Sequence, residues 1–264
     1  MTKAEIITLP ETALVTLRSR ANEARRPDGV IDDPMAIRLI DALEFDSDKF
    51  DLDATRQDIA LRALAFDDKA RAYLVDHPQA TVVALGEGLQ TSFWRLDAAG
   101  LGNEFRWLTV DLPPIIEIRE QHLPTSPRIS TRAQSVLDFS WMDDIDPRAG
   151  VFITAEGLLP YLQPDDALRV IAECARRFPG GQMIFDLPNK FQAFLARHRI
   201  WTALRGGWPR TPFSLSQKEI AELVNAVPGI RAVHNVPPPR GRGPALDLLL
   251  WPTVASLPLL EFDS

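Results

Sequence analysis

Short apolar runs alternate with amphipathic stretches from residue 81 onward. Runs that are rich in β-branched and aromatic residues and bounded by glycine or polar residues predict buried strands. The stretches between them carry apolar residues at helical spacing, which predicts helices. The five predicted strands are 81–86, 105–111, 128–135, 151–155 and 182–187. This alternation predicts a parallel sheet with helices on its faces.

The C-terminal part of the chain breaks this alternation. Two further strand-like runs, 230–236 and 245–251, are separated only by the proline-rich segment 237–244. That segment cannot form a crossover helix, so we expect the two strands to pair in antiparallel fashion. Five βα units followed by such a pair predict an α/β, Rossmann-like fold of the class I methyltransferase type. Its sheet has seven strands and is mostly parallel, with a C-terminal antiparallel strand, whereas a dehydrogenase domain would keep all strands parallel.

The residues before the first predicted strand show helical spacing. Two amphipathic stretches, 12–23 and 58–74, lie on either side of Asp33-Pro34, a typical helix start because proline suits the first turn. Arg62 lies among apolar positions of the second stretch. It is either a solvated, snorkelling arginine or a functional cation.

Length and charge narrow the class of protein. The chain has 264 residues, the size of one large α/β domain, and we predict a helical cap (1–78) on an α/β core (79–264). The formal charge of −7 argues against nucleic-acid binding. The lone Cys174 excludes an intramolecular disulfide and a cysteine-rich metal site, and no metal is predicted. No stretch approaches the ~20 apolar residues of a membrane span, and the N-terminal residues lack the apolar run of a signal peptide. We expect a cytoplasmic monomer or homodimer that acts on a small molecule.

A glycine turn follows the first predicted strand. Gly86 and Gly88 match the start of a dinucleotide fingerprint, but Thr91 stands where the third glycine is required. That glycine lets a helix N-terminus pack close to a pyrophosphate. S-adenosylmethionine (SAM) carries no phosphate, so a SAM site relaxes the requirement. A turn without a ligand is the alternative.

Three acidic residues lie at the end of a predicted strand or after it. Asp111 can accept hydrogen bonds from ribose hydroxyls or cap the next helix. Asp138, after Leu137, can accept from the amine of an adenine ring or cap a helix. Glu156 is costly to bury without a cation, which a cofactor's ammonium or sulfonium or Arg62 would supply.

Several segments together resemble the leucine carboxyl methyltransferase family, including its bacterial relatives that methylate polyketides and other small molecules. The likeness covers roughly residues 10–190. The segments are TAL at 12–14, DDPMA at 32–36, VALGEGLQTSFWRL at 83–96, DLP at 111–113, LDFSW at 137–141, AEGLLPYL at 155–162 and FPGG at 178–181.

The resemblance implies a SAM-dependent O-methyltransferase whose N-terminal helices cap the cofactor. It implies that an arginine of the helix before the first strand meets the methionine carboxylate, which fits Arg62. It further implies a glycine turn, a ribose acid, an adenine-side acid and a late-strand acid. The implied cofactor-binding residues are Arg62, Gly86, Gly88, Asp111, Leu137, Asp138 and Glu156.

The chain departs from the family pattern near the glycine turn. Gln90 and Ser92 replace a common Asp and Arg, Glu87 replaces Ala, and Pro160 often corresponds to Met. The changes at 90 and 92 remove a charge pair beside the turn. They mark either a subfamily with the same function or a site with weakened SAM affinity.

The acceptor site is the least determined part. A carboxylate acceptor needs no base, whereas a hydroxyl acceptor benefits from one. His198 is the candidate base, with a surface histidine as the alternative. The candidate acceptor-binding residues are Tyr161, Phe191, Phe194 and Trp201, which core packing would explain equally well. A SAM-binding protein without activity and a nicotinamide-dependent oxidoreductase are the alternative functions.

Overall fold

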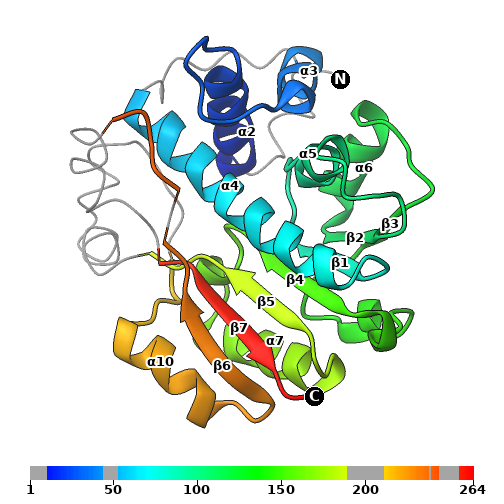
Figure 1. Cartoon of the computed structure of the whole chain (residues 1–264), viewed down its shortest axis with the longest axis vertical. Helices are drawn as coiled ribbons and strands as arrows, with labels where there is room; N and C mark the ends of the chain where they lie inside the picture. The colour runs from blue at the N-terminus through cyan, green and yellow to red at the C-terminus, as the bar shows by residue number, and fades with distance from the viewer. Residues whose placement is uncertain (1–10, 44–52, 189–210, 238, 244–255) are drawn as a thin grey trace.

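A computed structural model describes residues 11–43, 53–188, 211–237, 239–243 and 256–264, and its centre is a seven-stranded sheet (Figure 1). The strand order is β3-β2-β1-β4-β5-β7-β6. The strands are β1 (Thr81–Leu85), β2 (Arg106–Asp111), β3 (Ile129–Ala133), β4 (Val151–Ala155), β5 (Gln182–Phe185), β6 (Ile230–Asn235) and β7 (Pro258–Phe262). The first five strands are mutually parallel, and β7 runs antiparallel to both β5 and β6. The predicted α/β fold, mostly parallel with a C-terminal antiparallel strand, is confirmed.

The strand that pairs with β6 is not the predicted one. The antiparallel partner is Pro258–Phe262, whereas the predicted run 245–251 lies outside the described residues. The proline in the sequence PLLEF makes this strand hard to recognise from the sequence, since proline cannot donate a backbone hydrogen bond to a neighbouring strand. Here Pro258 is the first residue of β7, a position where proline is tolerated.

Helices cover both faces of the sheet. They are α2 (Glu11–Ala24), α3 (Pro34–Ala42), α4 (Asp53–Asp76), α5 (Ser92–Ala98), α6 (Pro113–His122), α7 (Pro164–Arg177) and α10 (Gln217–Ala226). Short 3-10 turns are η2 (Phe139–Met142), η3 (Pro147–Ala149) and η4 (Leu159–Tyr161). None of these described helices combines the length and the apolar character that a bilayer crossing requires.

The two cores follow the strand alternation. Val83 and Leu85 of β1 pack into the cluster that includes the buried residues of α7 and α10, while Val82 and Ala84 face the cluster built with α4 and α5. Successive residues of a strand point to opposite faces, so one short run serves both cores.

The helices α2 and α3 form a separate layer at the end of the molecule away from α7 and α10 (Figure 1). Their apolar residues cluster with Leu89, which follows the glycine turn, and with Ile115 and Ile118 of α6. Asp33 begins α3 as predicted, because its carboxylate accepts a hydrogen bond from the Ala36 N–H at 2.9 Å. This layer therefore lies against the segment that follows β1.

Candidate cofactor site

The carboxyl ends of four neighbouring strands bring the candidate residues together. Leu85 of β1 pairs with Val110 of β2, so the glycine turn and Asp111 leave the sheet side by side. The chain crosses outward from β1 to β2 and β3, and from β4 to β5, so the switch point of the sheet lies between β1 and β4. In open α/β sheets, ligands bind at such a point, beyond the carboxyl ends of the strands.

The glycine turn requires both of its glycines. Gly86 and Gly88 each have φ of +58°, in the left-handed region that side chains disfavour. A Cβ on Gly86 would lie 2.8 Å from Cδ1 of Leu158, whereas one on Gly88 would meet only Ala13 at 3.7 Å. The turn is therefore held close to the loop after β4 and is covered by α2.

Asp111 fixes this turn through its side chain. One carboxylate oxygen accepts a hydrogen bond from the Gly88 N–H at 2.6 Å and the other accepts from the Leu112 N–H at 2.7 Å. Burial raises the pKa of Asp111, while these two N–H groups act in the opposite direction. The residue at the N-cap of α6 is Leu112, so the prediction that Asp111 alternatively caps this helix is wrong. Each oxygen keeps a lone pair for a further donor.

Asp138 lies in the loop after β3, beside Asp111. The Gln134 N–H donates to the carbonyl oxygen of Asp111 at 2.9 Å, and its side-chain amide donates to the carbonyl oxygen of Asp138 at 2.8 Å. The Asp138 carboxylate caps η2 by accepting from the Ser140 N–H at 3.2 Å, as the capping alternative predicts. The side chain is exposed and Leu137 is half-buried, so the loop places both at the Asp111 side of the site.

Arg62 of α4 joins two carboxylates. Its Nε donates to Glu156 at 2.9 Å and its Nη1 donates to Asp186 at 3.0 Å. Burial raises the pKa of Glu156, and the charge of Arg62 opposes that rise. Arg62 is therefore a partner of Glu156, one of the two partners that the sequence allows.

Asp186 is a further candidate residue at these strand ends, and the sequence analysis above does not include it. The prediction extended the fifth strand to 187 and so placed Asp186 inside it, but β5 ends at Phe185. The available signal is the one that singles out Asp111 and Glu156, a carboxylate at the end of a strand or directly after it.

Tyr161 in η4 is half-buried. Burial raises the pKa of its hydroxyl, and the negative charge of Asp186 raises it further. The other predicted acceptor-site residues, Phe191, Phe194 and Trp201, and the candidate base His198 lie outside the described residues.

Ion pairs and hydrogen bonds hold the α2–α3 layer against the segment that contains the glycine turn. Arg20 is fully buried, with Nε donating to Asp33 at 3.3 Å and Nη2 donating to the carbonyl oxygen of Leu89 at 2.8 Å. Asp33 also accepts from the Thr91 hydroxyl at 2.7 Å and from Arg95 at 2.6 Å. Thr91 thus stands where a dinucleotide fingerprint has its third glycine, and its side chain takes part in these contacts through Asp33.

Glu87, one of the departures from the family pattern, has partners within the protein. Glu87 accepts hydrogen bonds from Trp107 and Thr109, and its carboxylate lies 2.8 Å from Arg119 of α6. Arg119 also donates to the carbonyl oxygens of Gly88 and Gln90 at 2.9 and 2.8 Å. The turn is therefore supported by Glu87 and Arg119.

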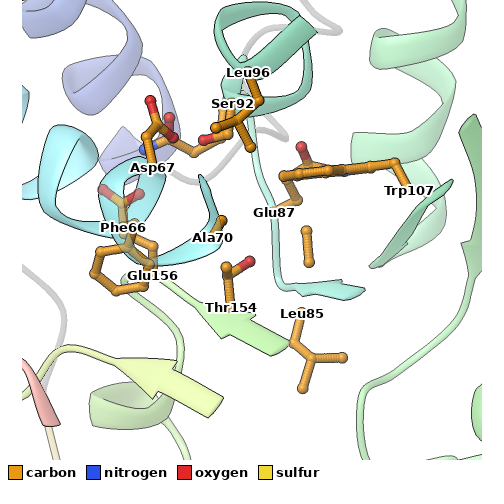
Figure 2. Close-up of a pocket in the computed structure, with 12 residues that line it drawn as sticks. Phe66, Asp67, Ala70, Leu85, Glu87, Ser92, Leu96, Trp107, Thr154 and Glu156 are labelled. Carbon is orange, nitrogen blue, oxygen red and sulfur yellow. The ribbon is translucent and has the colours of Figure 1, made fainter. Parts of the chain in front are cut away.

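A small pocket lies beneath the turn, between the sheet and helices α4 and α5. Figure 2 shows Glu87 and Trp107 on one side and Phe66, Asp67 and Glu156 on the other. Gln90 and Ser92 also line it. The Ser92 hydroxyl accepts from Arg95 at 2.8 Å, whereas the buried Oε1 of Gln90 has no hydrogen-bond partner among the described residues.

Comparison with known proteins defines the class of protein. The fold is that of the class I methyltransferases. A DUF574 family protein from Streptomyces avermitilis superimposes with a TM-score of 0.60 over 94% of this chain and 97% of its own, at 16% identity. The leucine carboxyl methyltransferase family model matches residues 13–175. The chain belongs to this family.

Two relatives show where the chain lies within the family. It is 31% identical to the tetracenomycin polyketide synthesis O-methyltransferase TcmP of Streptomyces glaucescens over 178 residues, which are 67% of this chain and 64% of TcmP. It is 26% identical to the SAM-dependent methyltransferase dpfgK of Gibberella zeae over 84% of this chain and 79% of that protein. The matched region thus spans somewhat less than two thirds of TcmP.

Proposed function

We propose that the protein is a SAM-dependent O-methyltransferase that methylates a carboxyl or hydroxyl group of a small, polyketide-type molecule. The supporting observation is the set of polar groups at adjacent strand ends. Asp111 lies beside the glycine turn, and Arg62 and Glu156 lie across the switch point from it. The likeness to TcmP supports the acceptor class.

The described residues fit SAM. Arg62 uses Nε and Nη1 for its two carboxylates, and within the described part of the chain Nη2 donates no hydrogen bond. That nitrogen would meet the methionine carboxylate. Asp111 would hold the ribose, Gly86 and Gly88 would allow close backbone approach, and Leu137 with Asp138 would border the adenine.

Bound SAM supplies a methyl group already activated by its sulfonium. The chain's own residues then contribute mainly by holding donor and acceptor in line and by excluding water. Tyr161 is no general base, because its raised pKa keeps the hydroxyl protonated at neutral pH. We expect it to donate a hydrogen bond to the acceptor instead.

The structure gives a reason to disfavour the nicotinamide alternative. Thr91 is the N-cap residue of α5 and donates its hydroxyl proton to Asp33, so its side chain occupies the position where a dinucleotide fingerprint needs glycine. The alternative of a SAM-binding protein without activity rests on Gln90 and Ser92, which lie beside the turn.

Calorimetric titration with S-adenosylhomocysteine and with NAD tests the cofactor. We expect binding of the first and none of the second. Transfer of a labelled methyl group from SAM to a matched pair of acceptors, 2-naphthol and 2-naphthoic acid, tests the reaction. Absence of S-adenosylhomocysteine binding would overturn the proposal, whereas binding without transfer to a broad panel of hydroxyl and carboxyl acceptors would favour the inactive alternative.

A further inference from the structure

Asp186 occupies a position equivalent to that of Glu156. Ala155 at the end of β4 pairs with Phe185 at the end of β5 in parallel register. The next residue on each strand is an acid, so Glu156 and Asp186 leave the sheet side by side. Both side chains are 7% exposed.

Asp186 is held in a fixed position. One carboxylate oxygen accepts from Arg62 Nη1 at 3.0 Å, and the other accepts from the Gly157 N–H. Gly157 lies directly after Glu156, so the Asp186 carboxylate also fixes the loop that carries Glu156. The two acids and Arg62 form one contiguous group, which we call the Arg62 cluster.

The Arg62 cluster carries more negative than positive charge. Two carboxylates share hydrogen bonds with one guanidinium, and the charge of Asp58 acts on the same guanidinium. Buried charges are unfavourable unless they are paired. The charges of Arg20 and Arg95 offset this excess only in part, because Arg20 is itself paired with Asp33, and Arg95 with Asp33 and Asp67. The effect is visible at Glu156, whose pKa is raised by burial and also by the charge of Asp186. A further cation at this place would be stabilised.

We propose that Asp186 is a cofactor-binding residue that, with Glu156, holds the ammonium of the cofactor's amino-acid end. The inference rests on the proposed function and adds to it a residue from β5. The same contacts fix Arg62 so that Nη2 is free for the neighbouring carboxylate of the cofactor. The cofactor's ammonium then lies opposite the two carboxylates, and its carboxylate lies opposite Arg62. Such a site favours a ligand with an amino-acid group over one with a purely apolar tail.

Three ligands separate this role from a structural one. S-adenosylhomocysteine carries both the ammonium and the carboxylate. 5′-Deoxy-5′-(3-aminopropylthio)adenosine keeps the ammonium but lacks the carboxylate. 5′-Methylthioadenosine lacks both and keeps the nucleoside. Their dissociation constants for the wild-type chain, Asp186→Asn and the control Asp165→Asn, an exposed acid in the first turn of α7, are measured by calorimetry.

We expect Asp186→Asn to weaken binding of S-adenosylhomocysteine and of the aminopropyl compound by tenfold or more. Binding of 5′-methylthioadenosine should stay within twofold, which also shows that the variant is folded. Asp165→Asn should bind all three like the wild type. An equal loss for all three ligands, a loss for S-adenosylhomocysteine alone, or no loss would each overturn the inference. A wild-type chain that binds none of them would instead overturn the proposed function, on which the inference rests.

Discussion

The two ends of the candidate site are built from different groups. At the Asp111 end, a carboxylate is fixed by backbone N–H groups of Gly88 and Leu112. At the Arg62 end, two carboxylates are fixed by one guanidinium that reaches them across 94 and 124 positions of the sequence. Backbone donors carry no net charge, so the contacts that fix Asp111 are hydrogen bonds and not ion pairs. The second end depends on a balance of full charges, and its stability is more easily disturbed.

The largest effect is expected at the Arg62 end. Arg62→Leu removes the cation and leaves Glu156 and Asp186 buried side by side. Breaking a buried ion pair costs several kcal/mol, and because the Arg62 side chain is 22% exposed we expect the free energy of unfolding to fall by ~3 kcal/mol. Urea denaturation measures this. Arg62→Lys keeps the charge and should cost clearly less, and an unchanged stability in Arg62→Leu would show that the carboxylates are solvated rather than buried.

The glycine turn between the two ends gives the next effect. Gly86→Ala imposes a left-handed conformation on alanine and a contact of 2.8 Å with Leu158, so we expect a loss of ~2 kcal/mol in unfolding free energy. Gly88→Ala has the same φ but only an ordinary contact with Ala13, and should lose ~1 kcal/mol. Thermal or urea unfolding of the pair isolates the contact from the backbone strain. Equal losses would contradict the close approach of Leu158 to the turn.

At the Asp111 end the expected effect is on affinity. Asp111→Ala removes a carboxylate that would accept from the ribose hydroxyls, and S-adenosylhomocysteine should bind ~2 kcal/mol more weakly, typical of hydrogen bonds to a charged group. The same loss is expected for 5′-methylthioadenosine, since both ligands carry the ribose. This contrasts with the Asp186→Asn change at the Arg62 end, where only ligands that carry the ammonium should respond. Unchanged affinity in calorimetry would remove Asp111 from the site.

The same contrast explains what could be predicted from the sequence. The Asp111 end depends on residues that are local to strand termini: a glycine turn after one strand and an acid at the end of the next. Strand–turn signals therefore identify it. The parallel order of the five strands follows in the same way from the alternating pattern, and Asp33-Pro34 marks the start of α3 correctly.

The Arg62 end depends on contacts that no local pattern contains. Which of two partners Glu156 takes is decided by where α4 packs on the sheet. Asp186 can be recognised as a residue at a strand end only once β5 is known to end at Phe185, two residues before the predicted end. The β7 strand was missed for a related reason, because the position of Pro258 at a strand start is fixed by its pairing with β6. Tertiary packing, rather than propensity, decides these cases.

The smallest expected effect is a release of protons when the cofactor's ammonium binds beside Glu156. Its measurement tests whether a cation enters the Arg62 cluster. Burial holds the pKa of Glu156 above its ordinary value of 4.5, against the charges of Arg62, Arg20 and Arg95, while Asp186 adds to the rise. An ammonium bound beside it would stabilise the carboxylate and lower that pKa, so binding releases protons in the window above 4.5, and affinity rises as the pH increases through it. Calorimetry of S-adenosylhomocysteine binding in buffers of different ionisation enthalpy measures the release. S-adenosylhomocysteine should release more protons on binding than 5′-methylthioadenosine does, and Glu156→Gln should abolish this difference. Proton uptake, or identical release with both ligands in the wild type, would mean that no cation approaches Glu156, and the two ends of the site would then differ in construction but not in the charge of what they bind.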